Sequence, residues 1–292
     1  MSKKLRLAGT GVMGRAVIEK MISAGQEITA YDPFPEALEK AAGLGAEVVD
    51  STAELVRGAE MVIMLLPGPA QIEKLVRGPQ GLLARAEGAP ILVDMSTSDP
   101  ALSEELAAQA IAQGIGWLDA PILGRPDTVG NWCLPVGGRA EDMESCRSVL
   151  EIIAGRIMHI GPAGSGHKLK LLNQMMFGAI NAMTAEMMAI SEKVGIPPKT
   201  LYEAISASRA GTVSNLFLDL GRRIADDDYA NPTFTVDLLI KDVSLGVAMA
   251  RQHKAPPVLG RSVECLNELS QAQGRGGQDT SVMWKSVRKL WE

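Results

Sequence analysis

Two hydrophobic patterns divide the chain near residue 160. Before that point, short apolar runs alternate with amphipathic stretches that have the spacing of helices. Strands are predicted at residues 5–8, 27–31, 46–49, 61–66, 91–93, 117–119, 132–136 and 157–160. Helices are predicted at residues 15–24, 35–42, 51–56, from Asp99 to about 113, and 140–150. Repeated strand–helix units predict an α/β fold with a Rossmann-like, doubly wound parallel sheet.

After residue 160 the pattern is helical to the end. Helices are expected at about 166–194, 198–208, 214–226, 235–253, 257–273 and 279–290. We therefore predict two domains, a sheet domain at residues 1–162 and an all-helical domain at residues 163–292. The long helix that begins near 166 would join them, and the substrate is expected in the cleft between the two.

A glycine-rich turn follows the first strand and opens the first helix. It consists of Gly9, Thr10, Gly11, Val12, Met13 and Gly14. Glycines at this spacing allow a tight turn and let a pyrophosphate approach the helix N-terminus, whose free N–H groups favour anions. Asp32 follows the second strand, where a carboxylate accepts hydrogen bonds from the adenosine ribose and repels a 2′-phosphate. The motif predicts a dinucleotide site that favours NAD over NADP.

Composition excludes several classes of function. The chain has 292 residues, 46% of them hydrophobic, with a net charge of −5, which gives no electrostatic footprint for nucleic acid or an anionic membrane. The three cysteines are widely spaced, and no metal site is predicted; His159, His167 and His253 are interpreted as surface or satisfied polar residues. Without a signal peptide pattern or a membrane-spanning run, a cytoplasmic enzyme is expected.

Lys170 is the strongest candidate for catalysis. It lies in the first turns of the long apolar helix that follows the glycine-rich turn at 161–166. A lysine in an apolar helix is costly to bury without a partner or a purpose. Asn173 and Gln174 follow three and four residues later and share its face. The three side chains could bind and protonate a carbonyl oxygen; the alternative is a lysine that reaches solvent and has no role.

With these motifs assembled, the chain resembles the β-hydroxyacid dehydrogenase family. The resemblance rests on GTGVMG, LLPGPAQ, DMSTSDP, DAPILGRP, GSGHKLKLLNQ and FTVDLLIKD, which together span nearly the whole sequence. It implies NAD-dependent hydride transfer to or from a short 3-hydroxy acid or its semialdehyde, and homodimers or homotetramers built through the long helix. The residues with implied roles are Leu66, Pro67 and Gln71 along the cofactor, Thr97 near the nicotinamide ribose, the catalytic Lys170, and Lys241 approaching from the helical domain.

Two departures from the family pattern affect the substrate. The family usually has a serine and two glycines after the sixth strand, where they hold the substrate carboxylate; this chain has Leu123, Gly124 and Arg125. A guanidinium there favours a sulfonate, phosphate or carboxylate, and sulfolactaldehyde reductases are similar in this respect. The asparagine that the family places four residues after its lysine is Gln174 here.

Two other functions remain open at this stage. An imine reductase has the same architecture with an apolar pocket, which Leu123 favours and Lys170 opposes. A cofactor-binding module without catalysis is also possible because the loop at 122–130 is altered, although Lys170 and its amide neighbours oppose it.

Overall fold

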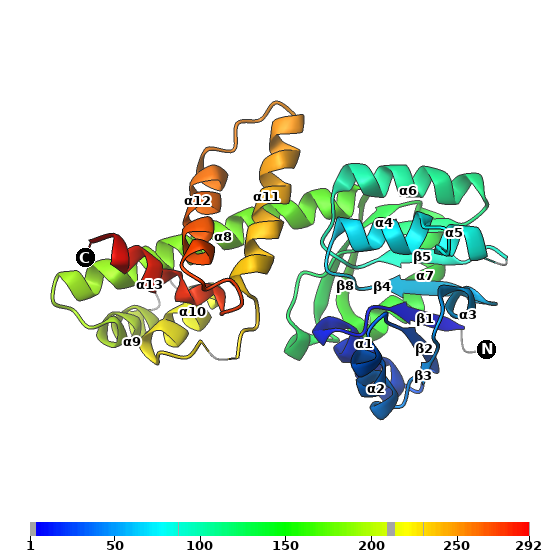
Figure 1. Ribbon diagram of the computed structural model, residues 1–292, viewed down its shortest axis with the longest axis horizontal. Helices are drawn as coiled ribbons and strands as arrows, with labels where there is room; N and C mark the ends of the chain where they lie inside the picture. The colour runs from blue at the N-terminus through cyan, green and yellow to red at the C-terminus, as the bar shows by residue number, and fades with distance from the viewer. Residues whose placement is uncertain (1–3, 87, 209–213, 230, 292) are drawn as a thin grey trace. The chain divides into compact units, whose positions relative to one another are not determined.

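The computed structural model describes residues 4–86, 88–208, 214–229 and 231–291. The chain divides into two compact units, Met1–Lys170 and Leu171–Glu292 (Figure 1). The division falls inside one continuous 29-residue helix, α8 (Ser165–Lys193), rather than at the predicted boundary of 162. The first turns of this helix therefore belong to the sheet unit, and the rest belongs to the helical unit.

The described part of the first unit is built on one eight-stranded sheet with the order β3-β2-β1-β4-β5-β6-β7-β8. Its first six strands have the 3-2-1-4-5-6 order of a Rossmann fold, with the chain reversing direction across the sheet between β1 and β4. The strands are β1 (Leu5–Ala8), β2 (Ile28–Tyr31), β3 (Glu47–Val48), β4 (Met61–Met64), β5 (Ile91–Asp94), β6 (Gly116–Asp119), β7 (Trp132–Gly138) and β8 (Ala154–Gly161).

Helices cover both faces of this sheet because apolar side chains point from each strand in both directions. One core packs α1 (Val12–Ser23), α2 (Pro35–Gly43) and α7 (Ala140–Ile153) on one face. The other core packs α3 (Thr52–Val56), α4 (Pro69–Arg77), α5 (Leu82–Arg85) and α6 (Pro100–Ala112) on the opposite face. The sequence analysis missed α4 and α5, because the prolines and glycines around them resemble a loop.

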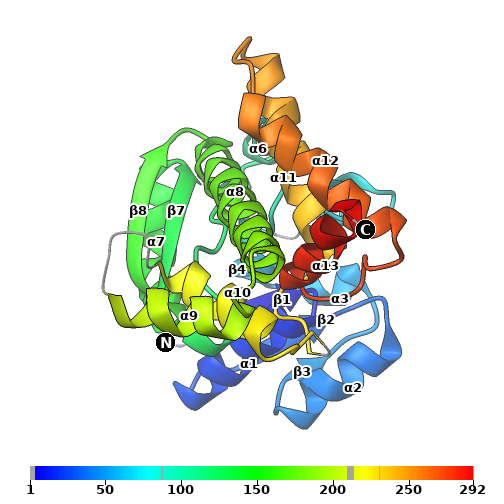
Figure 2. The same ribbon diagram turned by 90° about the vertical axis from the view of Figure 1, so that its left-hand side faces the viewer.

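The predicted doubly wound parallel sheet is confirmed except at one pair of strands. β7 runs antiparallel to β6, with Leu118 opposite Gly138 and Asp119 opposite Gly137, whereas β8 returns parallel to β7 after α7. β7 and β8 lie side by side (Figure 2). The connection from β6 to β7 contains only a 3₁₀ turn, η1 (Pro126–Thr128), and no crossover helix. A parallel strand needs such a crossover, so the chain turns back instead.

The second unit is helical, as predicted, in the part of the chain that the structure describes. Besides α8 it contains α9 (Pro198–Ser208), α10 (Asn215–Ala225), α11 (Val236–Gln252), α12 (Val258–Ala272) and α13 (Met283–Arg288), with 3₁₀ turns η2 (Thr280–Val282) and η3 (Lys289–Trp291). The predicted helix at 279–290 is three short pieces, and the Asp279 side chain caps the first of them by accepting hydrogen bonds from the N–H and hydroxyl of Ser281. Among the described residues, no helix is long and apolar enough to cross a membrane.

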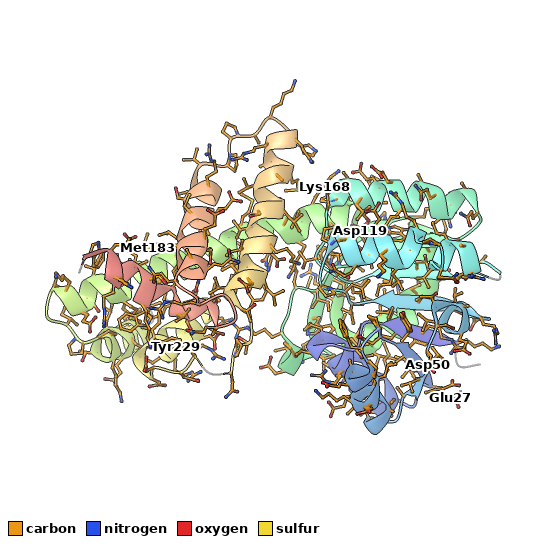
Figure 3. All side chains as sticks on the ribbon, in the orientation of Figure 1. Glu27, Asp50, Asp119, Lys168, Met183 and Tyr229 are labelled. Carbon is orange, nitrogen blue, oxygen red and sulfur yellow. The ribbon has the colours of Figure 1, made fainter. Side chains whose placement is uncertain are left out.

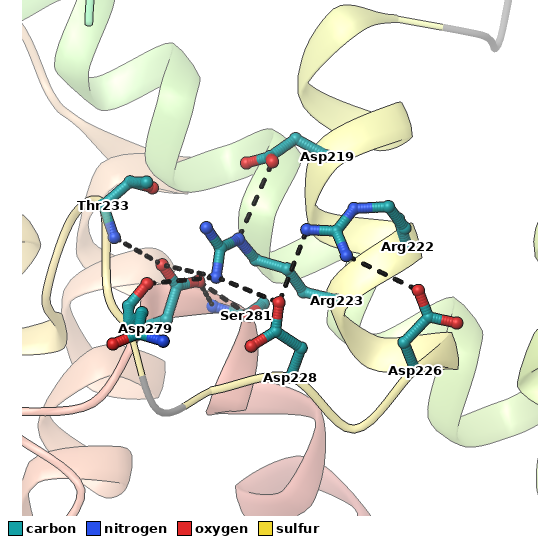
Figure 4. A network of polar contacts seen from close by, with 9 residues as sticks. Asp219, Arg222, Arg223, Asp226, Asp228, Thr233, Asp279 and Ser281 are labelled. Carbon is teal, nitrogen blue, oxygen red and sulfur yellow. Dashed lines mark hydrogen bonds and ion pairs between the residues drawn. The ribbon is translucent and has the colours of Figure 1, made fainter. Parts of the chain in front are cut away.

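A buried arginine ties together three segments of the helical unit. Arg223 on α10 lies 3.6 Å from a carboxylate oxygen of Asp219 and 3.9 Å from those of Asp228 and Asp279 (Figure 4). It also donates a hydrogen bond to the carbonyl oxygen of Asn231. Its side chain is 8% exposed, so these charges interact with little solvent screening. The network joins α10, the segment after it and the start of η2.

Candidate functional site

The glycine turn has the geometry that a pyrophosphate requires. Gly9 has φ +94°, and a Cβ there would lie 2.2 Å from the carbonyl oxygen of Leu65. A Cβ at Gly14 would lie 2.0 Å from the carbonyl oxygen of Gly9, so this glycine allows α1 to pack against the turn. At Gly11, by contrast, a Cβ would meet nothing within 4 Å. The first and third glycines close the turn, and the second leaves the helix N-terminus open to a ligand.

Asp32 closes the other side of this turn. One carboxylate oxygen accepts hydrogen bonds from the backbone N–H of Thr10 at 2.7 Å and from its hydroxyl at 3.2 Å. The other oxygen accepts the N–H of Phe34 at 3.1 Å. A carboxylate accepts about four hydrogen bonds, so capacity for a ribose hydroxyl remains. The turn and the acid predicted from sequence therefore form one connected unit that fits a dinucleotide.

The loops after β4 and β5 are tied together at the carboxyl edge of the sheet. The Ser96 hydroxyl accepts the N–H of Leu66 at 2.9 Å, and the N–H of Ser96 is held by Asp94 at 3.0 Å. The structure therefore brings together the predicted cofactor residues Leu66, Pro67 and Thr97. Asp99, rather than Ser96 or Thr97, caps the next helix, because its side chain accepts the N–H of Ala101. Gln71 lies in the first turn of α4 and is exposed.

The loop after β6 is held by a buried tryptophan. Trp132 is fully buried, and its indole N–H donates to the carbonyl oxygen of Arg125 at 2.7 Å. A Cβ at Gly124 would lie 2.1 Å from the Trp132 ring, so only glycine fits at that position. The Thr128 hydroxyl accepts the N–H of Arg125 and donates to its carbonyl oxygen. The backbone of Arg125 is thus fixed, while Leu123 and the side chain of Arg125 are half-buried.

Lys170 does not extend into solvent. Its Nζ donates a hydrogen bond to the carbonyl oxygen of Ile122 at 2.8 Å, and the residue is half-buried. Lys168, only two residues earlier, pairs instead with Glu104 on the surface (Figure 3). The interpretation of Lys170 as a lysine that only reaches solvent is therefore wrong. The ammonium lies beside the loop that carries Leu123 and Arg125.

Asp119, at the end of β6, anchors the start of the helix that carries Lys170. Its two carboxylate oxygens accept the backbone N–H groups of Gly164 at 2.7 Å and His167 at 2.9 Å. Burial raises the pKa of Asp119 above its ordinary value, although the charge of His167 and the two N–H groups act in the opposite direction. Gly166 fits here because a Cβ would lie 2.4 Å from the carbonyl oxygen of Asp119.

A second polar group lies in the helical unit. Gln174 donates to Asp242 at 2.6 Å, and Asn173 donates to Gln174 at 3.2 Å. Lys241 pairs with the other oxygen of Asp242 at 2.8 Å. Asp242 is buried, with an exposed fraction of 2%. These side chains form one chain of contacts on α8 and α11.

One histidine differs from its prediction. His167 was interpreted as a surface or satisfied polar residue, yet it is fully buried and neither ring nitrogen has a hydrogen-bond partner among the described residues. Its Nε2 lies 3.7 Å from a carboxylate oxygen of Asp94. The histidine's neighbours in sequence gave no signal, because the residues facing it come from β5 and β6. Within the described residues, no group of three potential ligands could hold a metal.

Comparisons with known proteins agree with this arrangement. Residues 4–161 match a family model described as the NAD binding domain of 6-phosphogluconate dehydrogenase. Residues 164–287 match one described as NAD-binding of NADP-dependent 3-hydroxyisobutyrate dehydrogenase. The chain is 33% identical to 3-hydroxyisobutyrate dehydrogenase of Pseudomonas aeruginosa, over 97% of this chain and 96% of that protein. It is 31% identical to L-threonate dehydrogenase of Cupriavidus necator, over 98% and 96%.

More distant relatives bear on the alternatives. The structure of 3-hydroxyisobutyrate dehydrogenase of Mycobacterium tuberculosis, with L-serine, superimposes with a TM-score of 0.86 at 27% identity, over 99% of this chain and all of that one. The 3-sulfolactaldehyde reductase of Escherichia coli is 27% identical, over 96% and 94%. An imine reductase from Pseudomonas sp. matches less closely, with a TM-score of 0.62 at 19% identity, over 98% and 100%, which shows only a shared fold.

Proposed function

Because the chain belongs to the β-hydroxyacid dehydrogenase family, an NAD(P)-dependent group of oxidoreductases, we propose that it interconverts a short 3-hydroxy acid and its semialdehyde with NAD as cofactor. The single observation that carries the proposal is the position of Lys170. Its ammonium is half-buried, held by a backbone carbonyl, and adjacent in the fold to the loop at 122–125.

Lys170 would be the proton donor and acceptor. The bound nicotinamide supplies or accepts the hydride. In reduction, the Lys170 ammonium donates a hydrogen bond and then a proton to the carbonyl oxygen of the substrate; in oxidation, the neutral amine removes the hydroxyl proton. Its hydrogen bond to the Ile122 carbonyl oxygen restrains the position of the ammonium beside the loop at 122–125.

The neighbouring lysine provides a matched test. Lys170→Ala should lower kcat by roughly 10²–10⁴, which is the usual contribution of a general acid–base. Lys168→Ala, on the same helix, removes only a surface ion pair with Glu104 and should leave kcat within about twofold. Turnover would be measured with a panel of small hydroxy acids and semialdehydes, including sulfonates, and with cyclic imines. Equal rates for the two variants would contradict the role of Lys170, whereas turnover of imines alone would favour an imine reductase.

Asp32 supports a preference for NAD. Its carboxylate is fixed by three hydrogen bonds where the adenosine ribose would bind, and a 2′-phosphate there would be repelled. The segment from residue 33 to 39 contains no lysine or arginine that could neutralise such a phosphate. We expect a higher kcat/KM with NAD than with NADP, and Asp32→Ser should reduce this difference. A wild-type preference for NADP would contradict the assignment.

Arg125 supports an anionic substrate. Trp132 and Thr128 fix the backbone of this residue through its N–H and carbonyl groups, so its guanidinium starts from a defined position in the loop. An anion bound there would gain charge-assisted hydrogen bonds worth about 1.5–3 kcal/mol. Arg125→Ala should therefore raise the substrate KM by roughly tenfold or more with little change in the KM for NAD. If the substrate KM does not change, Arg125 is not the anion-binding group.

A second copy of the chain is the partner that α8 favours. An exposed apolar stripe runs along the part of α8 in the helical unit, at the spacing of one helix face; its members are Leu172, Met176, Met183, Met187 and Ile190. Such a stripe is typical of an interface between subunits. Met183→Glu together with Met187→Glu should shift the mass in light scattering toward the monomer, whereas Ile111→Glu on α6 should not. An unchanged mass would exclude α8 as the interface.

A further inference from the structure

Three ionisable side chains are buried together in the sheet unit, and the proposed proton transfer uses none of them. They are Asp94 at the end of β5, Asp119 at the end of β6 and His167 in the first turn of α8, with exposed fractions of 1%, 0% and 0%. Burying polar groups without hydrogen bonds costs free energy, because each such group loses its hydrogen bonds to water. An apolar side chain at position 167 would avoid that cost, so the presence of an imidazole requires an explanation.

The partners of His167 can be identified from the atoms that lack other contacts. Its Nε2 is 3.7 Å from Oδ2 of Asp94, and neither atom has a hydrogen-bond partner among the described residues. The other oxygen of Asp94 is occupied by the N–H of Ser96, and both oxygens of Asp119 accept backbone N–H groups. A hydrogen bond needs a separation of about 2.7–3.2 Å, so a movement of less than about 1 Å would join the two free atoms.

This contact connects two groups of residues that must be aligned for hydride and proton transfer. Asp94 holds Ser96, and Ser96 in turn holds Leu66, so the carboxylate orders the loops assigned to the cofactor. His167 lies on the same helix as Lys170, three residues earlier, which places the two side chains about one turn apart. A link between Asp94 and His167 is therefore a link between the cofactor loops and the proton donor.

We propose that His167 is a positioning residue whose Nε2–H binds Asp94 Oδ2 and sets the distance between the Thr97 loop and Lys170. The proposal rests on the function proposed above, because it needs Lys170 to act on a substrate next to the nicotinamide. Asp119 has a different role from Asp94. It accepts the backbone N–H groups of Gly164 and His167, and so fixes the start of the helix rather than a side chain. His167 itself touches neither substrate nor cofactor in this scheme.

The kinetic test compares two replacements of the same residue. His167→Leu keeps the volume but cannot donate a hydrogen bond, whereas His167→Gln offers an amide N–H. A misplacement of about 1 Å costs roughly 10²-fold in rate, so kcat of the leucine variant should fall by roughly 10- to 100-fold with the KM for NAD within about threefold. The glutamine variant should recover most of the loss. Equal kcat values for the leucine variant and the wild type, or no recovery by glutamine, would overturn the proposal.

A spectroscopic test does not depend on turnover. The chain has three histidines, and His159 and His253 are exposed, so the ring nitrogens of His167 can be assigned in ¹⁵N-histidine-labelled protein from their absence in His167→Gln. In the wild type, Nε2 should have the chemical shift of a protonated nitrogen in a hydrogen bond, and Asp94→Asn should change it. Glu104→Gln, which affects only the surface pair with Lys168, is the control. A shift that does not respond to Asp94→Asn would refute the contact.

The two proposals can fail separately. If Lys170→Ala retains full turnover, the proposed catalytic role fails, but the ¹⁵N measurement still decides whether His167 binds Asp94. If Lys170 is essential while His167→Leu is as active as the wild type, only the positioning role of His167 fails. Should the leucine variant not fold, the wild-type spectrum and the Asp94→Asn spectrum still test the contact.

Discussion

The Arg223 network in the helical unit and the Asp94–Asp119–His167 cluster in the sheet unit are both buried, yet their polar atoms are used differently. In the first, one guanidinium lies within 4 Å of three carboxylates, and Asp279 also accepts N–H groups from Thr233 and Ser281 (Figure 4). In the second, the imidazole of His167 and one oxygen of Asp94 face each other at 3.7 Å without a hydrogen bond. Arg223 makes one hydrogen bond, to the carbonyl oxygen of Asn231, and its Nε has none among the described residues, whereas neither ring nitrogen of His167 makes one.

The difference indicates different roles. A buried arginine with three acidic partners joins segments that are distant in sequence, and it can do so only while every partner is present. The histidine cluster stands at the carboxyl edge of the sheet, where α/β proteins bind their ligands. Incomplete pairing of His167 at that edge has a use if a ligand or a small movement completes it, whereas Arg223 already has a hydrogen bond to Asn231 and three acidic neighbours.

The largest effect on stability is expected from breaking the Arg223 network in the helical unit. Arg223→Ala leaves buried carboxylates without their cation and should lower the free energy of unfolding by roughly 3–5 kcal/mol. Arg222→Ala, at the preceding position, removes exposed ion pairs with Asp226 and Asp228 and should cost less than about 1 kcal/mol. Urea denaturation followed by circular dichroism would measure both. Similar losses for the two variants would mean that the burial of Arg223 does not matter.

A smaller effect is expected at the acid that completes the same network. Asp279→Asn keeps the shape of the side chain but cannot accept all the hydrogen bonds from Thr233 and Ser281, so it should cost about 1–3 kcal/mol. Asp226→Asn is the exposed control and should be close to neutral, with a change of about 0–1 kcal/mol. Thermal or urea unfolding of both variants measures the difference. A neutral Asp279→Asn would show that Arg223 alone holds the segment.

The smallest effect is a dependence of the protein's stability on pH, which is expected from Asp119 in the Asp94–Asp119–His167 cluster. Burial raises the pKa of Asp119 above 3.8, so the folded protein binds this proton more tightly than the unfolded chain does. The resulting stabilisation is complete below pH 3.8 and is lost as pH rises through the folded value. The stability of the wild type relative to Asp119→Asn should therefore decrease as pH rises from 3.8 through the raised pKa of folded Asp119, and then become constant.

Urea denaturation of the wild type and of Asp119→Asn at several pH values would test whether their difference in stability decreases as pH rises. A difference that increases with pH would mean that the N–H groups of Gly164 and His167, together with the charge of His167, outweigh burial at Asp119. The same series in the presence of NADH would show whether the cofactor loops influence the cluster.

Much of the fold could be predicted because its signals are local. All eight strands and the helices of the second unit lie within a few residues of their predicted positions, since apolar periodicity and N-cap residues such as Asp99 depend on neighbours in the chain. The helix α4 was missed because Gly68 and Pro69, which read as a loop, instead begin a helix. The direction of β7 was missed because it depends on the connection from β6, not on the strand itself.

The candidate site, like the fold, has features that a local sequence pattern predicts and features that it does not. The spacing of Gly9, Gly11 and Gly14 predicted the dinucleotide turn by itself, but their reasons differ: Gly14 packs against Gly9 within the turn, Gly9 packs against Leu65 after β4, and Gly11 leaves the helix N-terminus open. Lys170 could be named from its position in an apolar helix, but its carbonyl partner could not. Only the tertiary structure decided that His167 faces Asp94 and that Arg223 meets Asp279, since residues so far apart in sequence are brought together by packing, which no local pattern encodes.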